Sequence, residues 1–188
     1  MKREKIKKFI IPVLAILFTA WVIRVIYINR TYAVDTVYLR LNDTIDYGDH
    51  TIIPAEARLF TLDEYEDFFG VQVDKGDIQG NSKEDKIIGL KLRIINTSEG
   101  SLPWSDVLSD IGMGFESLTW CSVSDPWLGR DINILYDDCF KTGVEIEFWL
   151  VTRVSRVSFG AGSWKKLRAE DFMFTLDIYP EPVRIIFK

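Results

Sequence analysis

The chain has 188 residues and carries 28 Asp or Glu against 23 Lys or Arg, a net charge of −5. The charge is unevenly divided, since residues 1–30 hold seven Lys or Arg and one Glu, whereas residues 31–188 hold 16 Lys or Arg and 27 Asp or Glu. An acidic surface of that size repels phosphate backbones and anionic lipid headgroups. We therefore expect the later part of the chain to bind no nucleic acid and not to lie flat on a membrane.

The amino-terminal residues have the pattern of a signal anchor. Residues 1–8 are a basic tail, and residues 9–28 form an apolar segment of twenty residues that contains one charge, Arg24. Twenty helical residues span about 30 Å, the thickness of a bilayer core. Cations before such a span indicate a cytoplasmic amino terminus. The sequence therefore predicts one N-terminal transmembrane helix in the cell membrane, with the C-terminal domain extracytoplasmic.

A cleavable secretory signal peptide is the alternative, because "TYA" at residues 31–33 resembles a cleavage site. This site lies far from the densest apolar run, which favours an anchor that stays uncleaved. Under either interpretation the residues after Asn29 lie outside the cytoplasm. Residues 29–35 form a short linker, and residues 36–188 are long enough for one domain with one core.

The domain is predicted to be rich in strands. In "KIIGLKLRIINTS", residues 86–98, four aliphatic side chains alternate with Gly, Lys and Arg, and this period of two indicates a half-buried strand that ends in turn residues. Six further segments have strand character: residues 36–41, 51–61, 115–123, 144–151, 170–178 and 183–187.

A short helix and a strand irregularity are also expected. Thr61 and Glu64 form a capping-box pattern, and Gly70 suits the left-handed position that ends a helix. Pro54 lacks a backbone donor, so it predicts an edge or a bulge in its strand. The acidic, Gly-rich residues 73–85 are expected to form a mobile hairpin loop.

Seven short antiparallel strands around one core favour an all-β fold, a two-sheet sandwich. The order of "LNDTIDYGDHTI", "ARLFTLDEYEDFFG", "KIIGLKLRIINTS" and "EDFMFTLDIYPEPVRIIF" resembles the domain of unknown function 5028 family, small membrane-anchored exported proteins of Gram-positive bacteria. The resemblance covers most of residues 36–188. It implies an immunoglobulin-like fold and an exported location, and it implies no catalytic residue.

Three tryptophans are candidates for an interaction surface: Trp104, Trp127 and Trp149. Trp104 and Trp127 follow prolines in expected loops, where they either anchor the loop to the sheet or contact a ligand. Trp149 lies on the outward face of its strand, where Glu145 and Glu147 give way to apolar residues. That apolar end is either covered by a loop or exposed as a docking patch, and we expect it to be covered.

Cys121 and Cys139 are the only cysteines. On the extracytoplasmic side they can form a disulfide that closes a loop of about 18 residues. Two unpaired thiols are the alternative.

Catalysis has little support in the sequence. The sole histidine, His50, is expected in an exposed turn, and no nucleophile, zinc-protease, phosphate-loop or dinucleotide motif is present. We therefore expect no enzyme and no cofactor, but a non-catalytic binding or interaction module with an envelope or secreted protein partner. The alternative is a glycan- or Ca²⁺-binding envelope protein that uses the Trp-bearing or acidic loops; the acidic residues lack the spacing of a calcium loop.

Overall fold

The structure is a computed structural model that describes all residues except 1, 32–34, 74–81, 112–113, 134–138 and 178–181. The chain divides into two units, Met1–Asp35 and Thr36–Lys188. Most of the loop expected at residues 73–85 lies outside the described residues.

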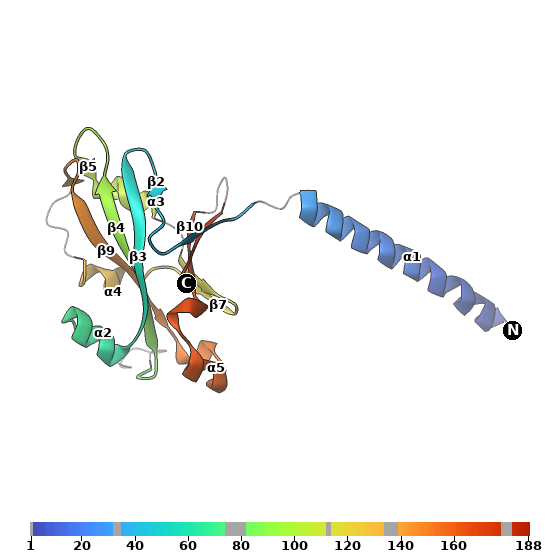
Figure 1. Cartoon of the computed structure of the whole chain (residues 1–188). Helices are drawn as coiled ribbons and strands as arrows, with labels where there is room; N and C mark the ends of the chain where they lie inside the picture. Colours follow the sequence, from blue (N-terminus) through green and yellow to red (C-terminus); the bar gives the residue numbers. More distant parts are fainter. Residues whose placement is uncertain (1, 32–34, 74–81, 112–113, 134–138, 178–181) are drawn as a thin grey trace. The chain divides into compact units, whose positions relative to one another are not determined.

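The first unit contains one helix, α1 (Lys2–Thr31), of 30 residues (Figure 1). Its side chains are described at residues 13, 14 and 16–30, and most of its large apolar side chains are exposed, although Val22 and Val25 are half-buried. Over the described part of the chain, no helix presents an apolar stretch long enough to cross a bilayer.

The second unit is mostly β-sheet with some helices. One sheet has four strands in the order β2 (Ile45–Asp46), β3 (His50–Thr61), β4 (Lys86–Asn96) and β9 (Glu145–Val154). All its neighbouring strands are antiparallel, and β3 and β4 are the longest. The alternation predicted for residues 86–98 is present from Leu90 to Ile94, where Leu90, Leu92 and Ile94 are fully buried while Lys91 and Arg93 point outward to pair with glutamates of β9. It is absent from residues 87–90, which are all buried.

The other large sheet has five strands. Their order is β1 (Val37–Arg40), β11 (Val183–Ile186), β10 (Met173–Asp177), β6 (Gly114–Ser117) and β7 (Trp120–Ser122). Residues 115–123 form most of a hairpin rather than one strand. The expectation of antiparallel strands throughout is wrong for β1, which pairs with β11 in parallel. A third pair joins β5 (Leu102–Pro103) to β8 (Cys139–Phe140).

One core unites these sheets. Its buried side chains come from the four-stranded sheet, for example Leu90 and Ile94, and from the five-stranded sheet, for example Phe115, Phe174 and Ile185. Because these residues form a single cluster, the inner faces of the two sheets are desolvated together, which is the main favourable contribution to folding.

A second, smaller cluster covers the outer face of the four-stranded sheet at one end. It contains Phe60, Leu62, Tyr65, Ile87, Trp149 and Val151. Helix α2 (Leu62–Phe69) supplies part of it. The first residues of β4 are therefore buried on both faces.

The helix predicted at residues 61–70 is confirmed with its caps. Thr61 is the N-cap, its hydroxyl accepts the Glu64 N–H at 3.2 Å, and the Glu64 carboxylate accepts the Thr61 N–H at 2.7 Å. The hydrogen bonds from Thr61 lower the pKa of Glu64. Gly70 closes the helix with φ 69°, in the left-handed region.

The irregularity predicted at Pro54 is also confirmed. The register of β3 against β4 shifts between Pro54 and Glu56, which is a bulge. The Pro54 carbonyl accepts a hydrogen bond from the Asn42 N–H at 2.6 Å.

Several helices that the sequence analysis did not predict lie between the strands. They are α3 (Trp104–Asp110), α4 (Pro126–Arg130), α5 (Ala161–Lys166) and the 3-10 turns Arg156–Ser158 and Ala169–Asp171. The domain is therefore β-rich rather than purely β.

We predict that Thr61→Ala destabilises the domain by about 1 kcal/mol, because the Glu64 N–H in the first turn of α2 loses its acceptor. Urea unfolding of the full-length chain measures the change. Thr61→Ser keeps the hydroxyl and is the matched control. Equal stability of the alanine and serine variants would contradict the capping role.

Candidate functional site

Trp149 is buried, with 8 % of its surface exposed. Its ring packs edge-on against Phe69 at 5.3 Å and Phe68 at 6.0 Å between ring centroids, both from α2. Its diagonal neighbour on β4 is Gly89, which pairs with Val151, and an added Cβ there would lie 3.2 Å from the Trp149 ring. The apolar end of the outward face of β9 is thus covered, by a helix rather than by a loop.

Trp104 is also buried, with its ring stacked on Phe140 at 4.8 Å. Trp127 differs from both, because 71 % of its surface is exposed on α4. Of the three tryptophans selected from the sequence, Trp127 is therefore the one available to a partner.

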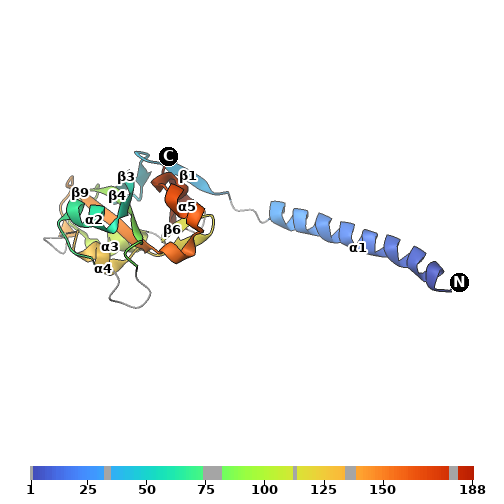
Figure 2. The same cartoon turned by 90° about the horizontal axis from the view of Figure 1, so that it is seen from below.

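The segment that carries Trp127 is attached to the edge of β9. The Asp125 N–H donates to the Val151 carbonyl at 2.7 Å. The Asn133 side chain bridges both polar groups of the Trp149 backbone, accepting its N–H at 2.7 Å and donating to its carbonyl at 2.8 Å. Residues 125–133 therefore hold α4 against β9, where Figures 1 and 2 place it.

Tyr65 of α2 also binds the segment of residues 125–133. Its hydroxyl donates to the Leu128 carbonyl at 3.1 Å. Burial raises the pKa of Tyr65, and the carboxylates of Asp125 and Asp131 raise it further. The hydroxyl therefore stays protonated at neutral pH and remains a donor.

Between α3, α4 and β9 lies a pocket of about 540 Å³, which we name the β9 pocket. Its lining is mainly apolar and consists of Leu108, Ile111, Val123, Ser124, Asp125, Pro126, Gly129, Arg130, Asn133 and Phe148 to Val151. The volume lies in the range of sites that take a small ligand or a few side chains of a protein. Val123 is 70 % exposed, so apolar surface continues outside the pocket.

Three polar side chains of the β9 pocket, those of Asp125, Arg130 and Asn133, already have partners. The Asp125 carboxylate caps α4 by accepting the N–H groups of Trp127 and Leu128. The Arg130 guanidinium pairs with Asp131 at 3.0 Å and lies 5.3 Å from the centroid of the Trp127 ring. Helix α4 was not expected from the sequence, although Asp125 followed by Pro126 is the pattern of an N-cap and first helical residue.

The two cysteines do not form a disulfide in the structure. Cys121 lies in β7 of the five-stranded sheet and Cys139 in β8 of the two-stranded pair, and both are exposed free thiols.

His50 is buried, with 1 % of its surface exposed, so the expectation of an exposed turn is wrong. It begins β3, stacks on the Tyr47 ring at 4.9 Å between centroids, and its Nδ1 lies 2.6 Å from Asp49 Oδ1. It does not line the β9 pocket.

Over the residues that the structure describes, no three His, Cys, Asp or Glu side chains come together as metal ligands would. Two acidic residues of α2 have structural partners: Glu64 closes the capping box, and Glu66 accepts the Val73 N–H at 2.8 Å.

Comparison with known proteins identifies no relative: no protein-family model, no curated protein and no solved structure matches the chain. The resemblance to the domain of unknown function 5028 family stays a prediction.

We predict that Asn133→Ala destabilises the domain by about 1–3 kcal/mol, because it removes the partners of the Trp149 N–H and carbonyl. Chemical denaturation of the full-length chain measures the loss. Ser105→Ala, at an exposed position of α3, is the control and should change stability by less than about 0.5 kcal/mol. If both variants unfold at the wild-type denaturant concentration, the bridge to β9 contributes nothing.

Proposed function

We propose that the protein is a membrane-anchored, extracytoplasmic, non-catalytic binding module whose β9 pocket receives an apolar segment of an envelope or secreted protein. The observation that carries the proposal is the apolar pocket with an exposed tryptophan, Trp127, on the helix that forms its wall.

The chemistry of this surface fits a protein partner. Trp and Arg are enriched among the residues that dominate binding energy at protein interfaces, and Trp127 and Arg130 lie together beside the pocket. Leu108 and Val123 add exposed apolar area next to them. Within the described residues β9 is also an edge strand, paired only with β4, and its first half, Glu145–Phe148, offers a backbone for a partner segment.

The composition of the pocket supports a non-catalytic role. Asp125 is the one carboxylate among its described lining residues, and it is engaged in capping α4. A general acid and base need two titratable groups near one another. A partner that binds through apolar contacts needs neither.

An immunoglobulin-like sandwich remains our proposal for the fold class. Its support is the order β11–β10–β6–β7, in which two hairpins, one at the end of the domain and one near its middle, lie side by side as in the G–F–C–C′ sheet of variable-type domains. The other sheet departs from the ABED order of those domains, because three consecutive strands, β2, β3 and β4, lie side by side before β9.

The proposed anchor is residues 9–28 of α1, with residues 1–8 in the cytoplasm. The supports are the cations that precede the apolar segment and the exposure of its large apolar side chains, among them Leu17, Phe18 and Trp21. A helix that exposes apolar side chains requires an apolar surrounding.

We predict that protease added to intact cells digests an epitope placed after Lys188, because the domain lies outside the membrane. Immunoblotting follows the epitope, and a cytoplasmic protein that stays intact is the control for cell integrity. Survival of the epitope while a known external protein is digested would overturn the orientation.

We predict that a photoreactive residue at Val123 crosslinks the full-length chain to an extracytoplasmic protein in intact cells. Trp127→Ala should lower the yield by about tenfold, since truncating a central aromatic residue of an interface costs on the order of 2 kcal/mol or more. The matched control is Tyr38→Ala, an exposed aromatic residue in β1, which should leave the yield unchanged.

Two results would overturn this function. One is a crosslinking yield that Trp127→Ala and Tyr38→Ala change equally. The other is binding of purified cell-wall glycans by the full-length chain that depends on Trp127, measured by tryptophan fluorescence, since an exposed indole ring also suits sugar stacking. That second result would favour the glycan-binding alternative.

A further inference from the structure

Positive charge is concentrated in one segment of an otherwise acidic domain. Residues 153–168, "RVSRVSFGAGSWKKLR", contain five Lys or Arg and no Asp or Glu. They form the end of β9, the 3-10 turn Arg156–Ser158 and helix α5. The domain as a whole is acidic, but the segment 153–168 is basic.

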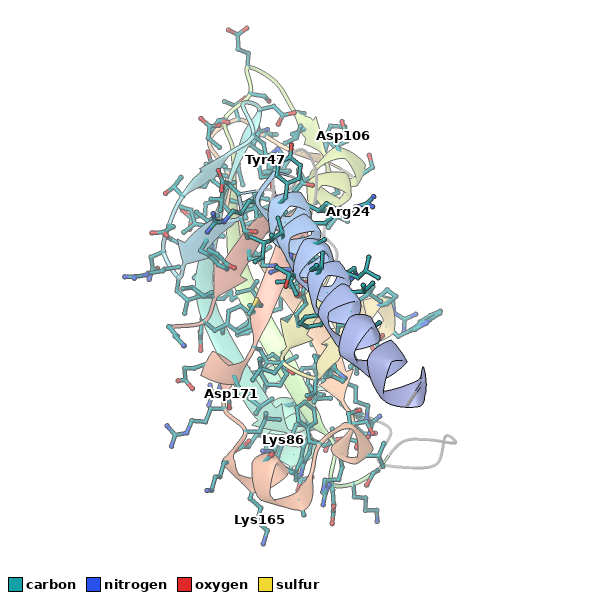
Figure 3. All side chains as sticks on the ribbon, turned by 90° about the vertical axis from the view of Figure 1, so that its right-hand side faces the viewer. Arg24, Tyr47, Lys86, Asp106, Lys165 and Asp171 are labelled. Carbon is teal, nitrogen blue, oxygen red and sulfur yellow. The ribbon has the colours of Figure 1, made fainter. Side chains whose placement is uncertain are left out.

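The fold adds two further lysines from a distant part of the chain. A second pocket, of about 390 Å³, is lined by Thr61, Lys83, Glu84, Asp85, Lys86, Arg156, Ala161, Trp164 and Lys165, and we name it the basic pocket. Its lining includes four cations and two carboxylates. Figure 3 shows two of these cations, Lys86 and Lys165, at the same end of the domain, with Tyr47 and Asp106 at the opposite end.

Both carboxylates of the basic pocket are already paired. Asp85 is buried and accepts hydrogen bonds from Arg153 Nε at 3.1 Å, the Arg156 N–H at 2.9 Å and the Ser82 N–H at 3.0 Å. Glu84 is exposed and lies 3.3 Å from Arg156 Nε. Arg153, outside the pocket lining, thus balances the buried carboxylate and leaves positive charge in excess.

The remaining cations of the pocket are Lys83, Lys86 and Lys165. The charge of Lys86 helps to lower the pKa of Glu64, so this lysine has a carboxylate in its vicinity. Lys83 and Lys165 form no ion pair with any carboxylate that the structure describes. Lys86 Nζ lies 5.0 Å from the centroid of the Trp164 ring and 3.4 Å from the Trp164 carbonyl oxygen. Trp164 is itself buried and packs against Phe159, so the ring beside the Lys86 ammonium is held in place.

We propose that the basic pocket binds a phosphate group. Several cations around one cavity suit a multiply charged oxyanion, because lysine acts as a point charge on phosphate and arginine donates from its guanidinium fork. A ligand with a single carboxylate would need only one of these cations. The inference is independent of the β9 pocket, which shares no lining residue with the basic pocket.

Two sources can supply this chemistry outside a cell membrane, namely a free phosphate ester and the headgroup of an anionic lipid. Three probes separate them: inorganic phosphate, glycerol 3-phosphate and a short-chain, water-soluble phosphatidylglycerol. Short-chain phosphatidylcholine, which has the phosphate but no net charge, is the comparison for the lipid.

The test is calorimetric titration of the purified full-length chain in a nonionic detergent. We expect saturable binding of at least one phosphate probe, weakened about fivefold or more by the double variant Lys83→Gln/Lys165→Gln, since each removed ion contact accounts for part of the affinity. The matched control is Lys141→Gln, an exposed lysine after β8 and outside the pocket. Its affinity should equal that of the wild type.

The melting temperatures of the wild type and the two variants should be equal, because the substituted lysines are at the surface. Equal melting temperatures exclude unfolding as the cause of weaker binding. Tighter binding of phosphatidylglycerol than of phosphatidylcholine supports the proposal and assigns the headgroup. Binding of the two soluble phosphates alone supports it and assigns a free ester. The proposal is overturned if no probe binds with a Kd below about 10 mM, or if the double variant and the Lys141→Gln control bind equally well.

Discussion

The burial of β4 on both faces at its start is the constraint on which the candidate site depends. One face of the strand belongs to the main core, and over residues 87–89 the other face lies under the second cluster. Gly89 has no side chain, and this leaves room for the Trp149 ring. Trp149 in turn presents its backbone to Asn133, which holds the segment that builds the wall of the β9 pocket. A side chain at position 89 would therefore disturb the β9 pocket, although Gly89 is not among the residues that line this pocket.

The two pockets illustrate different uses of the same strand. The edge of β9 near Trp149 is covered by a segment that leaves apolar side chains exposed. The end of β9 at Arg153 leads into the basic segment 153–168. Arg153 forms an ion pair with Asp85, which lies just before β4. One rigid strand thus fixes an apolar surface and a cationic surface on separate parts of the domain.

Local signals in the sequence predicted local structure well. The capping box at Thr61 and the bulge at Pro54 depend on neighbours in the chain, and both are present. The burial of His50 depends on Tyr47 and on the packing of β3, which no short pattern reveals. The exposed Trp127 and the buried Trp104 have the same local context, a preceding proline, and only the packing distinguishes them. The net charge of the domain was a poor guide to its local charge for a related reason. The acidic total is a sum over all residues, and it conceals the basic segment 153–168.

The parallel pairing of β1 with β11 has a consequence for biosynthesis. In the described part of the domain β1 has no other partner strand, and the residues that complete its ladder are among the last six of the chain. The first strand of this sheet must therefore wait, unpaired, until β11 has also been synthesised. Contacts between residues so distant in sequence form slowly, so we expect β1 to pair with β11 late in folding. Deletion of β11 would leave β1 without its neighbour in the described sheet.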